Sequence, residues 1–368
     1  MTTSQNLTRI LYLCLLAALV VLLAATGASA ELQIVWGPVL GDLTPTSAQA
    51  TWYTNVPALG GVEIGGQTVA WGGPVQAHHV LLRGLEPDRT YTYRLSVQTG
   101  AEKATSRWYH FTTPGPDLTT FTFCAYGDTR SDPAAHREVV GAMVQCKPRL
   151  VLHSGDLVSD GGALDGWKHF FPVIARFSPS VPLYPCLGNH ENNADLYYQL
   201  LPLPAGYSSH QREWYTVTFG SCQFIVLDSC RAQAEQSEWL QALLAKPRPP
   251  GVVWRIAMFH HPPYASGPHP PDADALKYFC PYLENGGVDL VFNGHNHYYE
   301  RSLKGRLNYV TVGGGGAPLY DHPALPNPYR QSLHVVLSFA KVEVTPEALQ
   351  VTALDTKLQT LDSFTVTH

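Results

Sequence analysis

Two histidines separated by a single residue follow a short apolar run late in the chain. Residues 288–292 are mainly apolar, and Gly294, His295, Asn296 and His297 come directly after Asn293. A run of this length and composition predicts a buried strand, so both imidazoles should project from its carboxyl end. Neutral imidazole is a common metal ligand near physiological pH. The stretch could therefore bind a metal ion, or it could be a polar turn whose histidines face water.

Four earlier apolar runs end in a similar way. The runs at 121–126, 150–152, 181–187 and 254–259 each lead into residues that can bind metals. In open α/β sheets, ligands bind beyond the carboxyl ends of the strands. We therefore expect one group of polar side chains at one sheet edge: Asp128, Asp156, Asn189, His260, His295 and His297.

This group contains two carboxylates, one amide and three imidazoles, all of which can bind a divalent or trivalent metal. Six ligands exceed the need of one four-coordinate ion. They suit two ions about 3.5–4 Å apart that share a carboxylate. Each motif alone could be an ordinary turn or a core histidine. Their ordered recurrence after apolar strands favours a metal site.

The composition sets limits on the function. The chain has 368 residues, of which 45% are hydrophobic and 14% charged, with a formal net charge of −5. This is typical of a globular protein of about two domains. No basic block occurs, which argues against a nucleic-acid partner. The chain also lacks a Gly-x-Ser-x-Gly nucleophile motif and a phosphate-binding loop of the Gly-x-x-x-x-Gly-Lys type.

Residues 1–30 are predicted to be a signal peptide. Arg9 precedes an apolar run, 10–25, and Ala28-Ser29-Ala30 provides a small-x-small cleavage site. The run is slightly shorter than the ~17–25 residues of a membrane-spanning helix. We expect a secreted or periplasmic protein with no stable membrane span after cleavage; an uncleaved N-terminal anchor is the alternative.

Export would place the six cysteines beyond the leader in an oxidising compartment, where disulfides can form. Their connectivity does not follow from the sequence. Cys222 and Cys230 flank a predicted extended strand, which is too long for these two thiols to bridge each other. The absence of a Cys-x-x-Cys pair argues against a thiolate zinc site.

Two domains are predicted from a change of pattern near residue 117. Residues 31–116 contain short alternating apolar runs separated by Gly and Pro turns, which predict a β-sandwich. Residues 117–368 alternate apolar strands with helical stretches, which predicts an α/β domain with a mixed sheet. The helices are expected at residues 133–146, 166–177, 233–245 and 273–284, with Pro281 dividing or kinking the last.

The ordered motifs resemble the calcineurin-like metallophosphoesterase superfamily. The series is Gly-Asp-x-x at 127–130, Gly-Asp at 155–156, Gly-Asn-His-Glu at 188–191, His-x-Pro-x-Tyr at 260–264 and Gly-His-x-His at 294–297. The predicted sandwich, whose residues 82–94 look like a fibronectin type III segment, and the stretches 260–264, 294–301 and 309–320 resemble the purple acid phosphatase branch. The resemblance implies a fibronectin type III-like domain followed by a metallophosphoesterase domain with mixed β-sheets flanked by helices.

The resemblance also implies roles for single residues. Asp128 and His297 would bind a first metal, and Asp156 would bridge the two ions. Asn189, His260 and His295 would bind the second metal, and His190 would contact the substrate and protonate the departing oxygen. The ions would be iron, zinc or manganese.

Two positions depart from the family pattern. Ser159 stands where the purple enzymes carry a tyrosine, so we expect no purple colour. Arg130 stands where many relatives have a histidine ligand, which leaves the first metal one ligand short. We expect His136 to fill that gap; otherwise it is a surface residue of the 133–146 helix. Arg130 could clamp a phosphate oxygen, or it could form a structural ion pair with a carboxylate.

The sequence therefore predicts a secreted metal-dependent phosphoesterase. It would hydrolyse small-molecule phosphate monoesters with a metal-bound hydroxide as nucleophile. A phosphodiesterase or nucleotidase with the same site is one alternative, because loops around the metals set the ester type. A secreted binding protein with an inert second domain is the other. The sequence predicts no particular oligomeric state.

Overall fold

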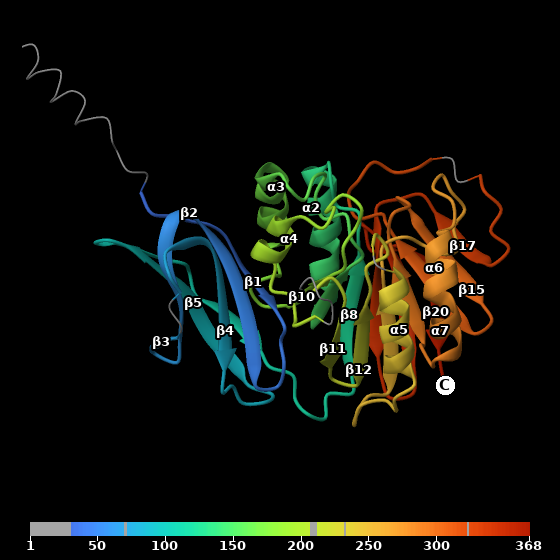
Figure 1. Cartoon of the computed structure of the whole chain (residues 1–368), viewed down its shortest axis with the longest axis horizontal. Coiled ribbons are helices and arrows are strands. Elements are labelled where there is room, and N and C mark those ends of the chain that lie inside the picture. Colours follow the sequence, from blue (N-terminus) through green and yellow to red (C-terminus); the bar gives the residue numbers. More distant parts are fainter. Residues whose placement is uncertain (1–30, 70–71, 207–211, 232, 322–323) are drawn as a thin grey trace, which may run out of the picture.

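The structure is a computed structural model that describes residues 31–69, 72–206, 212–231, 233–321 and 324–368. Three β-sheets and their helices form successive layers from one end of the molecule to the other (Figure 1). Residues 1–30, the predicted signal peptide, lie outside the described part. Among the described residues, no helix has the length and apolar character needed to cross a membrane.

The first sheet is built around one long strand, β2 (Ser47–Ile64). The first half of β2 pairs with β1 and β4, and its second half pairs with β3 and β5. β5 also pairs with β6 and β7. The two halves of β2 therefore belong to two groups of paired strands, and the buried side chains of both groups belong to one apolar core. The predicted all-β N-terminal part is confirmed. The other strands are β1 (Ile34–Gly41), β3 (Gln67–Val69), β4 (Val75–Arg83), β5 (Thr90–Thr99), β6 (Glu102–Thr105) and β7 (Tyr109–Thr112).

The second sheet has the strand order β10-β9-β8-β18-β19-β20. Its first three strands are parallel, and the last three are antiparallel additions from the end of the chain. The strands are β8 (Phe121–Tyr126), β9 (Leu150–His153), β10 (Leu183–Pro185), β18 (Ser338–Val344), β19 (Leu349–Asp355) and β20 (Thr360–Val366).

The third sheet has the order β11-β12-β13-β14-β16-β15-β17, with β12, β13, β14 and β16 parallel. It packs face to face on the second sheet. The ring of Phe123 on β8 lies 5.3 Å from that of Phe224 and 6.2 Å from that of Phe292, both edge to face. The strands are β11 (Tyr215–Phe219), β12 (Cys222–Val226), β13 (Trp254–Met258), β14 (Leu290–Asn293), β15 (Tyr299–Lys304), β16 (Leu307–Val312) and β17 (Arg330–His334).

Helices cover the outer faces of this pair of sheets. The green helices of Figure 1, α2 (Pro133–Met143), α3 (Leu164–Ile174) and α4 (Asp195–Leu200), lie on the side of the second sheet that faces the N-terminal strands. Trp36 of β1 stacks on Phe171 of α3 at 5.3 Å, which joins the first sheet to this layer. α5 (Gln233–Leu244), α6 (Ala273–Tyr278) and α7 (Cys280–Asn285) cover the third sheet.

The four predicted helices are present with shifted ends. The 133–146 helix ends as a 3-10 turn, η1 (Val144–Cys146), and the 166–177 helix starts at Leu164. Asp132 caps the first of them by accepting from two backbone N–H groups. The 273–284 helix is divided into α6 and α7, since Pro281 has no N–H to continue a helix. The expected mixture of sheets and helices after residue 117 is confirmed.

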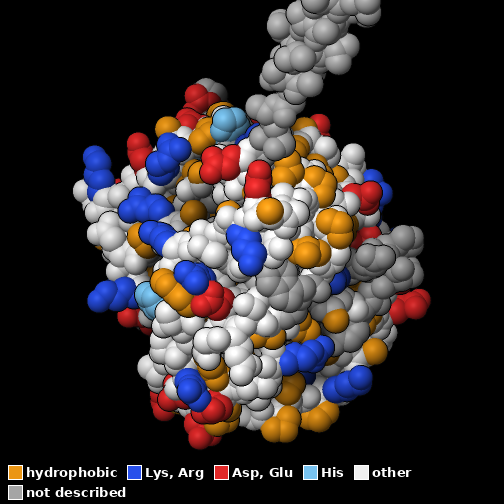
Figure 2. Space-filling model, turned by 90° about the vertical axis from the view of Figure 1, so that its left-hand side faces the viewer, with side chains coloured by type: hydrophobic (Ala, Val, Ile, Leu, Met, Phe, Trp, Pro, Cys, Tyr) orange, Lys and Arg blue, Asp and Glu red, His pale blue; other side chains and the backbone are white. Residues whose placement is uncertain are grey.

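The six described cysteines are all free thiols. The face of the molecule seen from the N-terminal sheet shows Lys and Arg interspersed with Asp, Glu and small apolar groups (Figure 2). That face therefore carries charge of both signs, as an ordinary solvated surface does.

Stability at low pH should depend on His78 inside the first sheet. Its ring stacks on Trp52 at 4.9 Å, and Nε2 contacts the Thr54 hydroxyl at 3.1 Å. Burial lowers the pKa of His78 to about 4 from 6.5. The unfolded chain therefore takes up this proton first as the pH falls. We predict that the free energy of unfolding falls between about pH 6.5 and about pH 4.

Chemical denaturation at several pH values would measure this effect. The decrease should be smaller in His78→Gln, which cannot titrate, and unchanged in His110→Gln, whose side chain is exposed on β7. Identical pH profiles for His78→Gln and the unmodified protein would contradict the prediction.

Candidate metal centre

The loops that follow the parallel strands of the second and third sheets meet at one edge. The backbone N–H of Asp128, after β8, donates to the Gly155 carbonyl after β9 at 3.0 Å. In the third sheet, the N–H of Gly294 after β14 donates to the His260 carbonyl after β13 at 2.8 Å. The structure thus gathers the strand-end residues that the sequence singled out.

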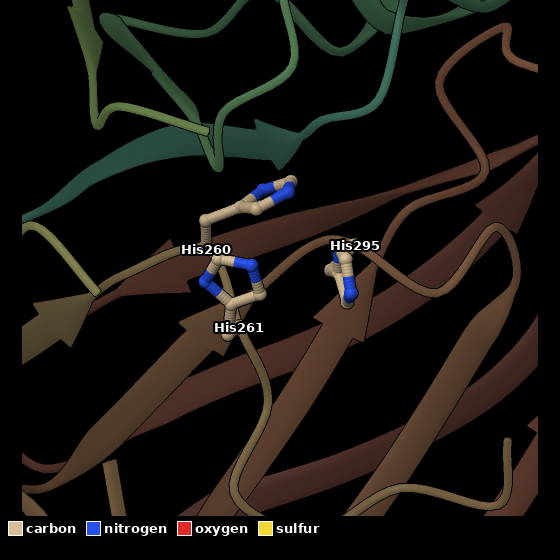
Figure 3. A group of neighbouring side chains, drawn as sticks. All are labelled: His260, His261 and His295. Carbon is tan, nitrogen blue, oxygen red and sulfur yellow. The ribbon is translucent and has the colours of Figure 1, made fainter. Parts of the chain in front are cut away.

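Asn189 and three neighbouring side chains form the first half of the centre. Nε2 of His260 lies 3.4 Å from Oδ1 of Asp156 and 3.1 Å from Oδ1 of Asn189. Nδ1 of His295 lies 3.0 Å from the same Asn189 oxygen. Figure 3 shows His260 and His295 at the ends of neighbouring strands, and the ring of His261 forms a triangle with theirs. An amide oxygen, a carboxylate and two imidazoles therefore converge.

Asp128 and His297 form the other half. Nε2 of His297 lies 3.7 Å from Oδ1 of Asp128. Asp128 also belongs with Asp156 and His260 to a group whose donor atoms all lie within 4.8 Å of one another. The two halves are therefore contiguous, with the Asp156 carboxylate close to both.

The hydrogen bonds of two histidines fix which ring nitrogen carries the proton. Nδ1 of His260 donates to the Ser154 carbonyl at 2.8 Å, and Nδ1 of His297 donates to the Pro318 carbonyl at 2.7 Å. In the neutral rings, Nε2 is therefore unprotonated and has a free lone pair. Nε2 of His297 is buried and has no hydrogen-bond partner among the described residues. A lone pair aimed at a carboxylate oxygen, with its other nitrogen held by a carbonyl, is the arrangement of a metal-binding histidine.

The electrostatics of the centre favour a bound cation. Burial raises the pKa of Asp128 well above its usual value, and the nearby charge of Asp156 raises it further. Burial lowers the pKa of His260 and His295 far below the usual value, and that of His297 to about 4. The imidazoles are therefore neutral and cannot compensate the carboxylates. Arg130 contributes one positive charge beside Asp156, and metal ions would supply the rest.

Three of these residues have unusual backbone conformations. Asp128, Asp156 and His295 have φ angles of 57°, 54° and 69°. This left-handed region is uncommon for residues with a side chain, and it costs of order 1–3 kcal/mol at each position. Hydrogen bonds to the two aspartate side chains stabilise this backbone conformation. The His295 N–H donates to both Asp128 oxygens at 2.9 and 3.0 Å, and the His190 N–H donates to Asp156 Oδ1 at 3.0 Å.

Two glycines beside the ligands are required by close approach. A Cβ atom on Gly294 would lie 2.5 Å from Oδ2 of Asp128. A Cβ atom on Gly188 would lie 2.3 Å from Oδ1 of Asp156. The glycines of the Gly-His and Gly-Asn motifs therefore leave room for the carboxylates.

Glu191 is a buried residue to which the sequence reasoning gave no role. Its carboxylate accepts hydrogen bonds from the backbone N–H groups of Gly188, Asp156, Leu157 and Val158, at 2.8, 2.9, 2.8 and 3.2 Å. Burial, followed by the charge of Asp156, raises the pKa of Glu191 to about 8. Glu191 thus stabilises the conformation of the loop that carries Asp156 by binding its backbone N–H groups. Its place beside His190 in the Gly-Asn-His-Glu motif was the available signal.

His190 and Arg130 both lie against Asp156. Nδ1 of His190 donates to the Ser159 carbonyl at 2.7 Å, which leaves Nε2 3.8 Å from Oδ2 of Asp156. Nε of Arg130 lies 3.3 Å from the same oxygen. The structure thus contains the ion pair that was one of the two interpretations of Arg130.

His136 is not brought into the groups of closely spaced donor atoms found among the described residues. It is 2% exposed, so the interpretation as a surface residue is wrong. Its Nε2 lies 3.3 Å from the Tyr126 hydroxyl, and its ring stacks on Phe170 at 5.5 Å. That His136 binds a metal stays a prediction without support from these contacts.

Three further side chains surround the centre. His261 shares a group of donor atoms with His260 and His295 (Figure 3). The ring of His269 lies 4.1 Å from that of His295, and Tyr320 stacks on His297 at 4.0 Å. The sequence reasoning missed His269 and Tyr320 because neither follows an apolar strand directly.

A comparison with protein families matches residues 121–299 to the calcineurin-like phosphoesterase family. Curated relatives include purple acid phosphatase 15 of Arabidopsis thaliana, 27% identical over 65% of this chain and 53% of the relative. A purple acid phosphatase of Glycine max is 28% identical over 67% of this chain and 57% of the relative. The chain thus spans somewhat more than half the length of these relatives.

Solved structures share the fold. The purple acid phosphatase of yellow lupin (Lupinus luteus) aligns with a TM-score of 0.74 and 20% identity, over 90% of this chain and 74% of the other. A structure of PhoD aligns with a TM-score of 0.66 and 15% identity, over 88% and 86% of the two chains. The expected fold class is confirmed. The chain therefore carries a calcineurin-like metallophosphoesterase domain and has purple acid phosphatases among its homologues.

Proposed function

We propose that this protein hydrolyses phosphate monoesters at a centre of two metal ions. The observation that carries the proposal is the pair of buried, bare imidazole nitrogens on His260 and His297. They face the carboxylates of Asp156 and Asp128 at 3.4 and 3.7 Å, while the proton of each neutral ring is held on Nδ1 by a backbone carbonyl. The names of the curated relatives support the phosphatase activity.

The ligand assignment follows the two halves of the centre. Asp128 and His297 would hold one ion, and Asn189, His260 and His295 would hold the other, with the Asp156 carboxylate close to both sets. The donor set of oxygen and nitrogen atoms suits iron, zinc or manganese. When bound, such ions neutralise charge that develops on the phosphoryl group and lower the pKa of water.

His190 is the proton donor in this proposal. The Ser159 carbonyl holds its Nδ1, so Nε2 is the nitrogen that faces the centre. In the protonated ring, Nε2 carries the proton that the departing alkoxide needs. General-acid catalysis of this kind contributes about 10²–10⁴ in rate.

Arg130 orients the phosphoryl group. Its guanidinium is held beside Asp156 through Nε, and its side chain is 19% exposed. One terminal nitrogen, Nη1, donates to the Ser131 hydroxyl at the long distance of 3.4 Å, which a phosphate oxygen could replace. A guanidinium binds phosphate oxygens in a bidentate manner.

We further propose the domain organisation and location that the sequence predicts. Residues 1–30 form a signal peptide, 31–116 a fibronectin type III-like domain and 117–368 the metallophosphoesterase domain. The protein then acts outside the cytoplasm on small soluble phosphate esters.

Two alternative functions can be compared with the proposed monoesterase activity. A phosphodiesterase or nucleotidase would use the same ligands and differ only in the surrounding loops. A binding protein with an inert second domain would not need both strained aspartates and the histidines directed at them. The presence of all six expected donor residues therefore favours catalysis.

The proposal predicts metal-dependent turnover. The metal content of purified protein would be measured, and the protein would be assayed with phosphate monoesters, diesters and nucleotides before and after chelation. We expect loss of activity on chelation, recovery with manganese, iron or zinc, and the highest kcat/KM with monoesters. Absence of bound metal and of turnover after metal addition would favour the binding protein.

Replacement of His190 should affect poor leaving groups most. We expect His190→Ala to lower kcat for alkyl phosphates by about 10²–10⁴ and to have a much smaller effect on p-nitrophenyl phosphate, whose leaving group needs no proton. Steady-state kinetics with both esters would test this. An equal loss for both would contradict the acid role.

Glu191 should support metal binding without contacting the ions. Removing its carboxylate frees four backbone N–H groups behind Asp156, so Glu191→Ala should weaken metal affinity by about 10–100-fold. Calorimetric titration with zinc would measure it. Glu238→Ala, exposed on α5, is the matched control. Unchanged affinity in folded Glu191→Ala would count against this role.

A further inference from the structure

A cavity of about 460 Å³ lies next to the candidate centre. It is formed by the loop between β8 and α2, the first turn of α2, the loop between β9 and α3, and α3 itself. Its volume is within the range of about 300–1,000 Å³ that holds small organic ligands. The space is therefore large enough for an aromatic ring system.

The deep wall of the cavity is apolar. Pro133, Leu157, Val158 and Phe170 line it, and the last three are at most 3% exposed. His136 belongs to the same wall, and burial lowers its pKa to about 3, so its ring is neutral. Binding of an apolar or aromatic group to such a surface is favourable, whereas binding of a charged group is unfavourable because the group loses its hydration.

The cavity adjoins the candidate centre through Arg130 and Ser159. Arg130 lines it and contacts Asp156 at 3.3 Å. Ser159 also lines it, and its carbonyl accepts the hydrogen bond that orients His190. A phosphate held by Arg130 would therefore direct its ester oxygen toward His190 and the rest of the alcohol into the cavity.

The outer rim is acidic. Asp160 and Asp165 line it and are exposed, and the exposed His169 lies 3.8 Å from the carboxylate of Asp165. Carboxylates at this position oppose a second phosphate or another anionic group on the substrate. A nucleoside triphosphate or a bisphosphate would meet this repulsion.

We infer that this cavity binds the alcohol part of the substrate and that the preferred substrates are phosphate monoesters of compact apolar or aromatic alcohols. The inference rests on the proposed phosphatase function and gives it a substrate class. Ala163 provides a way to test it, because this half-buried residue lines the cavity at the start of α3 and contributes no capping side chain.

Ala163→Phe should fill part of the cavity. We expect kcat/KM for 1-naphthyl phosphate to fall by at least about ten-fold, while that for methyl phosphate changes by less than about two-fold. Lys168→Phe, exposed on the same helix and outside the cavity, should behave as the unmodified protein. Circular dichroism would show whether Ala163→Phe is folded. If it is not, the smaller substitution Ala163→Leu is tested in its place. In the unmodified protein, 1-naphthyl phosphate should exceed ATP in kcat/KM.

Binding of non-hydrolysable phosphonates separates this inference from the proposed function. Calorimetry with 1-naphthylmethylphosphonate and methylphosphonate should show the same selective loss in Ala163→Phe. Equal effects on both ligands, or none, would overturn the cavity assignment. If all variants lack turnover but the naphthyl ligand is lost selectively, the catalytic proposal fails and the cavity assignment stands.

Discussion

Mutual repulsion between two buried carboxylates is the constraint on which this structure depends. Asp128 and Asp156 have donor atoms within 4.8 Å of each other, and the surrounding imidazoles are neutral. Such an arrangement is costly without compensating cations. The left-handed backbone at both aspartates and the glycines that make room for them are further costs of the same geometry. Metal binding is the simplest account of why all of these features occur together.

The two stacked sheets explain how the centre is assembled. Asp128 and Asp156 follow strands of the second sheet, whereas His260 and His295 follow strands of the third. The distance between these ligands therefore depends on the packing between the sheets, where Phe123 fits against aromatic rings of β12 and β14. Dense packing makes such an interface resistant to small shifts. A rigid core thus positions ligands that are far apart in the sequence.

The sequence is informative where local pattern and topology coincide. Parallel strands end at one sheet edge, so polar residues that follow apolar runs, such as Asp128 and His295, can be placed together from the sequence alone. His136 shows the limit, since helical spacing does not say which neighbour a ring will meet, and its partners are Tyr126 and Phe170. The binding of Glu191 to four backbone N–H groups also depends on a loop conformation that pattern does not determine.

One position connects the chemistry of the centre with the shape of its surroundings. Ser159 stands where the purple enzymes carry a tyrosine, and it lines the cavity beside Arg130. A tyrosine there would bring a bulky ring to this wall, whereas serine keeps the space open. Under the proposed function, the same small residue that provides no phenolate to the centre would leave room for the alcohol of the ester. The metal environment and the choice of substrate would then be coupled through this side chain.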